Sequence, residues 1–138
     1  MTDNIFNRIN VEIKRTYYIH ERYKSDSTFA IIYYEKALTP IELSEFIRIS
    51  DKFVQIDDNH CFMNFTFTTQ EDAFKASQNL LMYLDGHFNS RTTCIAIDTF
   101  NTSNSPQVVI NRLMQILQQT RKNSYSRIED EDILNGFI

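Results

Sequence analysis

Two strand-like runs joined by a short polar turn constrain the fold of this chain more than any other feature. Residues 52–56 and 61–68 flank a turn of four residues, Asp57, Asp58, Asn59 and His60. Short polar side chains of this kind hydrogen-bond the nearby backbone and tolerate left-handed conformations. Side chains of the second run alternate between an apolar face and a half-polar face: Cys61, Met63, Phe65 and Phe67 on the first, Phe62, Asn64, Thr66 and Thr68 on the second. The pattern predicts a β-hairpin.

Capping signals predict helices on both sides of this hairpin. The run Thr39-Pro40-Ile41-Glu42 combines a capping box with a proline at the first helical position, which predicts a short helix up to residue 47. Thr69 starts a longer helix that we expect to stop at Asp85 and Gly86. Apolar spacing and caps predict further helices at residues 3–23 and 105–120.

Apolar runs at residues 29–34 and 92–98 complete the set of predicted strands. The elements then follow the order helix, strand, helix, strand, strand, helix, strand, helix. The middle of this order is the βαββαβ arrangement of a ferredoxin-like α+β domain, an antiparallel sheet with its crossover helices on one face. The other face needs a cover. The first and last helices are the candidates, and we expect them to pack at the flanks or against a partner.

One domain at residues 1–122 and a polar, acidic tail at residues 123–138 account for the whole length. We expect the tail to be solvated, although its last residues, Phe137 and Ile138, are apolar. The apolar stripe of the first helix and the half-polar sheet face around Phe62 exceed what one small core covers. The sequence therefore predicts a homodimer or a complex with a protein partner, built through the terminal helices.

Composition disfavours several classes of function. The net charge is −4, with 14 basic and 18 acidic residues, so no overall field attracts a nucleic acid. The two cysteines, Cys61 and Cys94, lie in separate apolar runs, which is typical of reduced, buried thiols. No run approaches the length of a membrane span, and the first residues lack the apolar core of a signal peptide. We expect a cytoplasmic protein without a membrane partner.

The hairpin and its surroundings resemble the diguanylate cyclase (GGDEF) family. In that family a hairpin carries Gly-Gly-Asp/Glu-Glu-Phe between strands like residues 29–34 and 92–98, and a turn like residues 123–128 follows the last helix. The glycines let the backbone approach GTP, and the acids hold metal ions. Here the signature falls on five residues, none of which matches: Asp57, Asp58, Asn59, His60 and Cys61.

The resemblance implies a shortened, degenerate member of the family. The family's metal-ligating aspartate would fall near Glu35, which stands alone, and the chain between Glu35 and Asp57 is too short for the family's pair of helices. We therefore expect a regulatory or protein-interaction module that has no enzymatic activity, no catalytic residues, no metal and no cofactor.

One pair of residues keeps its place relative to the signature. In the GGDEF family an Arg-x-x-Asp pair ahead of the signature binds cyclic di-GMP, and Arg48 and Asp51 stand at that spacing. A guanidinium can fork onto a phosphate or a guanine edge, and a carboxylate can accept from guanine. The structural alternative is that Arg48 interacts with a helix C-terminus and Asp51 opens a strand. The resemblance implies a binding site for cyclic di-GMP.

A second family shares the βαββαβ core. The segment His60 to Phe67 also resembles an RNA-recognition motif, which stacks bases on aromatic residues of its middle strands. Phe62 could take this role, but Asn64 occupies the second stacking position, and the motif's glycines are absent. RNA binding is therefore the alternative function. His20, His60 and His87 lack the spacing of paired metal ligands.

Overall fold

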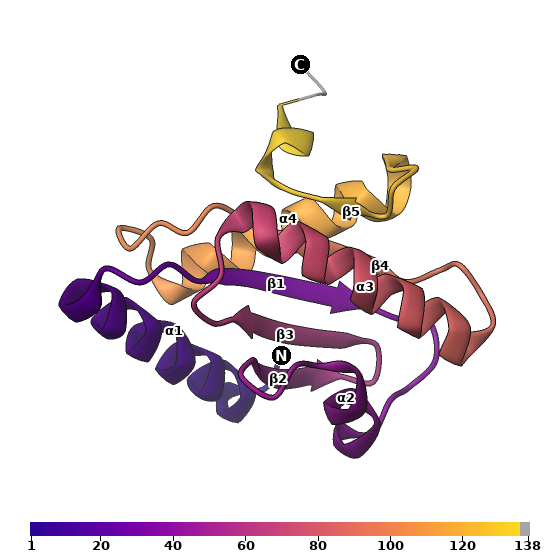
Figure 1. Cartoon of the computed structure of the whole chain (residues 1–138), viewed down its shortest axis with the longest axis horizontal. Helices are drawn as coiled ribbons and strands as arrows, with labels where there is room; N and C mark the ends of the chain where they lie inside the picture. The colour runs from indigo at the N-terminus through magenta and orange to yellow at the C-terminus, as the bar shows by residue number, and fades with distance from the viewer. Residues whose placement is uncertain (136–138) are drawn as a thin grey trace.

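The structure, a computed structural model, describes residues 1–135. In this part of the chain five strands form one mixed sheet in the order β2-β3-β1-β4-β5 (Figure 1). Strands β1 to β4 pair antiparallel, as the sequence predicted, whereas β5 adds to β4 in parallel. The expectation of a purely antiparallel sheet was therefore wrong at one edge. The strands are β1 (Thr28–Tyr33), β2 (Lys52–Asp57), β3 (His60–Phe65), β4 (Cys94–Ile97) and β5 (Ile128–Glu129).

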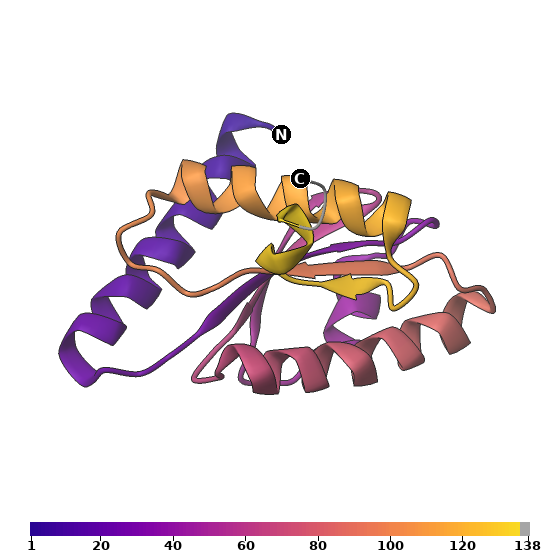
Figure 2. The same cartoon turned by 90° about the horizontal axis from the view of Figure 1, so that it is seen from above.

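Helices cover the sheet on both faces and make an α+β fold of three layers. Figure 2 shows α3 on one side of the sheet and α4 on the other. Residues of α1 share an apolar cluster with α4. The described residues form four α-helices and one short 3-10 helix: α1 (Asp3–Tyr23), α2 (Pro40–Phe46), α3 (Gln70–Phe88), α4 (Pro106–Asn123) and η1 (Glu131–Leu134). The order of the first four strands and their helices agrees with the sequence prediction.

The predicted caps explain where most of the helices begin. At α2 both bonds of the capping box form, with the Glu42 N–H donating to Thr39 Oγ1 at 3.2 Å and the Thr39 N–H donating to Glu42 Oε1 at 3.0 Å. The predicted stop of α3 at Gly86 was wrong. The helix continues through this residue to Phe88 and ends at Asn89, whose φ of 51° supplies the left-handed cap.

Each face of the sheet buries its own apolar cluster. Leu43 of α2 and Leu80 of α3 pack with alternate strand residues on one face. Ile9 of α1 and Leu113 of α4 pack on the opposite face, around Phe62, which is fully buried. The first and last α-helices thus cover the second face within the same chain, which is one of the two arrangements that the sequence predicted.

The described part of the predicted tail is packed against the sheet. Ile128 of β5 is 2% exposed and belongs to the same cluster as α3. Arg127 secures the turn before it with a bidentate pair to Asp85 of α3, at 2.6 and 3.0 Å. Further along, Glu131 accepts from Gln70 Nε2 at 2.8 Å. The expectation of a fully solvated tail does not hold for this segment, and the predicted apolar end, residues 137–138, lies outside the described residues.

We predict that Ile128→Ala lowers the free energy of unfolding by about 2–4 kcal/mol, because it empties a buried site under α3. Urea denaturation followed by circular dichroism measures this change. Tyr125→Ala is the control from the same segment, since this side chain is fully exposed, and we expect it to stay within about 0.5 kcal/mol. Equal stability of both variants would show that β5 is not docked.

Candidate functional site

Arg48 and Asp51 form a bidentate ion pair in the loop between α2 and β2. Arg48 Nε donates to Asp51 Oδ2 at 2.7 Å, and Arg48 Nη2 donates to Asp51 Oδ1 at 3.1 Å. Arg48 Nη2 also donates to Thr68 Oγ1 at 3.1 Å, across to the segment that follows β3. The structure thus brings together the two residues that the sequence singled out, and it links them to the start of α3.

The Asp51 carboxylate is committed to the protein. Its side chain is fully buried, and Oδ1 also accepts from the Thr66 N–H at 3.2 Å. A buried carboxylate is stable only when ion pairs or hydrogen bonds satisfy its oxygens in this way. In this arrangement the Asp51 oxygens hold Arg48 and the Thr66 backbone, and they are not exposed to an incoming ligand.

The Arg48 guanidinium, in contrast, keeps donors for a ligand. Its side chain is 49% exposed, and Nη1 has no hydrogen-bond partner among the described residues. The guanidinium carbon lies 5.7 Å from the centre of the Phe65 ring. Asp51, Thr68 and Phe65 therefore hold the planar group in one orientation while one edge of it remains open to solvent.

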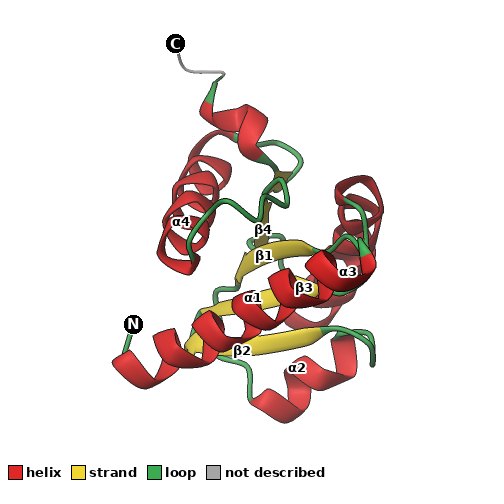
Figure 3. Ribbon diagram, turned by 90° about the vertical axis from the view of Figure 1, so that its left-hand side faces the viewer, coloured by secondary structure: helices red, strands yellow, loops and turns green. Residues whose placement is uncertain are grey.

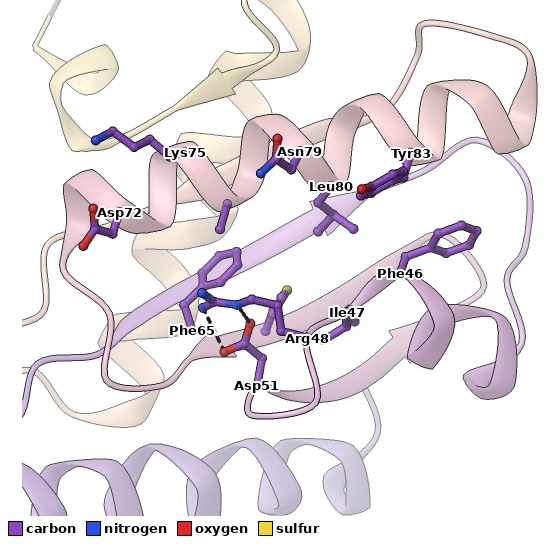
Figure 4. Close-up of a pocket in the computed structure, with 12 residues that line it drawn as sticks. Phe46, Ile47, Arg48, Asp51, Phe65, Asp72, Lys75, Asn79, Leu80 and Tyr83 are labelled. Atoms are coloured by element: carbon purple, nitrogen blue, oxygen red, sulfur yellow. Dashed lines mark hydrogen bonds and ion pairs between the residues drawn. The ribbon is translucent and has the colours of Figure 1, made fainter.

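A cavity of about 420 Å³ opens beside Arg48, between its loop and α3. Its floor is apolar, with Met63, Phe65 and Leu80. Figure 4 shows the side chains of α3 in a row above the ion pair, among them Lys75, Asn79 and Tyr83. The volume falls in the range of small-molecule sites. The arrangement offers a cation, an amide and an aromatic ring around an apolar floor.

We did not predict from the sequence that these α3 residues line a cavity. Asp72, Lys75, Asn79 and Tyr83 recur at intervals of three and four residues, so they share one helical face. That face also carries Ala76 and Leu80, which line the same cavity. A mixed polar and apolar stripe was therefore visible in the sequence. Only the packing of α3 over the Arg48 loop shows that the stripe faces a cavity instead of open solvent.

The hairpin residues to which the resemblance assigned the signature form a tight, self-bonded turn. Asp57 Oδ1 accepts from the Asn59 N–H at 2.8 Å and lies 2.8 Å from His60 Nδ1. Asn59 Nδ2 donates to the carbonyl oxygens of Tyr34 and Glu35, at 3.0 and 2.9 Å. These side-chain bonds tie the turn to the end of β1. A phosphate group would have to displace them to reach the backbone.

The electrostatics of this turn also disfavour an incoming phosphate. Burial raises the pKa of Asp57, but hydrogen bonds from Asn59 and His60 outweigh that effect and leave the pKa below its usual value. The carboxylate is therefore ionised at neutral pH. Asp58, next to it, is exposed and adds a second negative charge. The turn repels an anion unless a metal ion intervenes.

Glu35 and the three histidines lie in separate surroundings. Glu35 Oε2 accepts from Thr92 Oγ1 at 3.1 Å. The three histidines have separate surroundings: His20 beside Ser25, His60 beside Asp57, and His87 beside Glu42. Among the described residues, no group of three or more histidine, cysteine or carboxylate side chains is arranged to hold a metal ion.

Cys61, which follows the hairpin turn, points into the core. It belongs to the cluster under α2 and α3 and is fully buried, and Cys94 is buried as well. Burial raises the pKa of the Cys61 thiol to about 12. Desolvation likewise raises the pKa of Cys94, although Arg127 and Arg121 oppose it. Neither residue is a nucleophile in the folded chain.

We predict that both thiols resist a thiol reagent in the native protein. At pH 8 a thiol with a pKa of about 12 is ionised in roughly one molecule in ten thousand. Titration with a chromogenic disulfide should show slow reaction when the protein is folded and two rapid equivalents in denaturant. Rapid modification of the folded protein at Cys61 would contradict the burial described above.

Comparison with known proteins adds no family to this description. No protein-family model matches the chain, and no curated protein matches it. Within residues 1–135, no helix has both the length and the apolar character that crossing a membrane requires. The Arg48 cavity and the hairpin turn are thus the features on which a functional hypothesis rests.

Proposed function

We propose that this chain is a catalytically inactive, GGDEF-like regulatory module that binds cyclic di-GMP in the cavity beside Arg48. The observation that carries the proposal is the half-exposed guanidinium with free Nη1 donors at a cavity of about 420 Å³, whose lining is partly apolar and partly polar. A cyclic dinucleotide presents phosphates that an arginine can bind and flat bases that an aromatic side chain can stack on.

The proposed relationship to GGDEF domains includes a ferredoxin-like core. The segment from β1 to β4 has the connectivity βαββαβ, and its strands lie in the order β2-β3-β1-β4 with antiparallel neighbours. This order supports the ferredoxin-like assignment, because a split βαβ unit leaves a place for β3 between β1 and β2. In this proposal α1, α4 and β5 are additions that cover the second face and one edge of the core.

Loss of catalysis follows from the chemistry of the turn. Phosphoryl chemistry on GTP requires close backbone approach and bound metal ions. The Asp57 turn is closed by its own side chains, and Glu35 is engaged by Thr92. Both observations support a domain that binds or transmits a signal without turning over a nucleotide.

Within the cavity, we assign direct contact to Arg48 and a supporting role to Asp51. Arg48 offers Nη1 to a phosphate or to a guanine edge, while Asp51 and Thr68 hold the other side of the group. Lys75 adds a second exposed cation on α3, and Tyr83, 56% exposed, offers a ring to a base. This division of roles differs from the sequence expectation, in which both Arg48 and Asp51 touched the ligand.

The RNA-binding alternative is weaker on physical grounds. Phe62 is fully buried between β3 and the helices α1 and α4. A base could stack on its ring only if these helices left the sheet and exposed a whole apolar cluster. The buried state of Phe62 therefore favours the regulatory module over the RNA-recognition motif.

The remaining parts of the proposal concern partners and location. A regulatory module acts through another protein or through a second copy of itself, and we retain both options here. Two buried, unpaired cysteines support a reducing compartment such as the cytoplasm.

The first test concerns catalysis. We predict that purified protein incubated with GTP and magnesium or manganese forms no cyclic dinucleotide, because no described cluster of ligands would hold the metal. Chromatography of the nucleotides after long incubation measures this. A cyclic product that disappears in Glu35→Ala would refute the proposed inactivity.

The second test concerns binding. We predict saturable binding of cyclic di-GMP in isothermal titration calorimetry. Tyr83→Ala should weaken binding about fivefold through loss of stacking. Lys75→Ala should weaken it by a similar factor. Arg48→Ala should weaken it by about ten- to a hundredfold, through loss of a charge-assisted bond.

The controls separate ligand contact from folding. Arg48→Ala removes the ion pair of the buried Asp51 carboxylate, which then keeps the Thr66 N–H as its partner, and destabilises the loop. The variants of the exposed residues Lys75 and Tyr83 therefore give the decisive comparison. Tyr125→Ala and Lys122→Ala are matched controls, since both side chains are exposed and neither lines the cavity. No heat with wild-type protein, or equal affinity for Tyr83→Ala and Tyr125→Ala, would rule out this site.

A further inference from the structure

The two edges of the sheet differ in how open they are. The β5 edge ends in a strand of two residues, followed by η1. The β2 edge presents a strand of six residues, and among the described residues only β3 hydrogen-bonds its backbone. Figure 3 shows β2 as the outermost strand, with α1 and α2 beside it. An edge of this kind carries a row of unpaired N–H and C=O groups and is a template for another strand.

Two concavities lie along this open edge. One, of about 510 Å³, lies at the start of β2 and is lined by α1 residues together with Lys52 and Phe53. The other, of about 330 Å³, lies at the end of β2 and includes Asp57 and Asp58. Arg8 and Phe53 line both. The surface along β2 is therefore hollowed over the full length of the strand.

Charges of both signs line each concavity, and Arg8 lines both. Lys52 and Arg15 of α1 lie at the start of β2 and are exposed, and Arg15 Nη1 lies 3.7 Å from Glu12 Oε2. Asp57 and Asp58 lie at its end. Lys52 and Asp58 make no ion pair or hydrogen bond among the described residues, so both charges are available to a partner. An antiparallel partner strand places its start beside the end of β2 and its end beside the start of β2. Such a strand complements these charges if it carries cations at its start and acids at its end.

The strand β2 itself has that pattern. We propose that β2 of one chain pairs antiparallel with β2 of a second copy, about a two-fold axis, to form a continuous sheet across a homodimer. The two-fold axis brings Lys52 and Arg15 of one chain to Asp57 and Asp58 of the other, and repeats the contact at the opposite end. Opposite charges across paired strands favour this register, and like charges oppose the alternatives.

Pairing of this kind also covers exposed apolar surface. Val11 of α1 is 53% exposed and lines the first concavity, and Phe53 is only partly buried. A second strand seated along β2 would remove both from water. This inference rests on the self-association option of the proposed function, and it does not depend on nucleotide binding beside Arg48.

A charge swap tests the pairing. Sedimentation velocity of the full chain over a range of concentrations should show a monomer–dimer equilibrium. Lys52→Glu places like charges together at both ends of the interface, and we expect it to weaken the dimer about tenfold. Asp58→Lys should do the same. The double variant, Lys52→Glu with Asp58→Lys, restores opposite charges and should recover wild-type dimerisation.

Lys122→Glu is the control, because it makes the same charge change at an exposed site that lines neither concavity. It should leave the dimer unchanged. A monomer at every concentration would overturn self-association itself. If Lys52→Glu does not weaken the dimer, or if the double variant does not restore it, the two copies associate through a surface other than β2. Calorimetry with cyclic di-GMP on the same variants shows separately whether the Arg48 site is intact.

Discussion

A sheet that is apolar on both faces is the constraint on which the rest of this structure depends. In β1, Ile31 faces one cluster and Ile32 the other, and both are almost fully buried. Such a sheet cannot leave either face in water, because each exposed apolar face would cost a large part of a small domain's stability. The chain therefore needs helices on both sides. Because α1 and α4 cover the face of Phe62, both faces of the sheet are buried. A ligand or a partner can therefore reach only the loops and the edges of the sheet.

Among residues 1–135, three bidentate arginine–carboxylate pairs hold those loops and edges in place. Arg127 pairs with Asp85 and fixes β5, while Arg112 of α4 pairs with Asp98 after β4, at 2.7 and 2.9 Å. The third is the pair of Arg48 with Asp51. The arginine side chains are 14%, 38% and 49% exposed, respectively, so Arg48 is the most accessible of the three. A buried carboxylate that orients an accessible guanidinium serves the fold and, in the proposed function, a ligand site as well.

Side-chain hydrogen bonds close the hairpin turn. Asn59 Nδ2 donates to the carbonyl oxygens of Tyr34 and Glu35 at the end of β1, and Asp57 caps the turn from within. Glycine residues at these positions would leave the backbone open to a ligand. The turn in this chain is therefore a structural joint between β1 and the hairpin, and the cavity beside Arg48 lies elsewhere, under α3.

Local hydrogen bonds explain what the sequence determined by itself. The capping box of Thr39, the cap at Thr69, the hairpin turn at Asp57 and the spacing of Arg48 and Asp51 involve residues two or three positions apart, so their partners are fixed by the sequence order. Alternation of apolar residues likewise indicated the strands and the α+β class. Packing over long distances in the chain decided the remainder. Three features depend on which segments meet in space: the burial of Ile128 in a fifth strand, the burial of Phe62, and the packing of the α3 stripe over Arg48. Side-chain type alone does not choose between partners that are equally apolar.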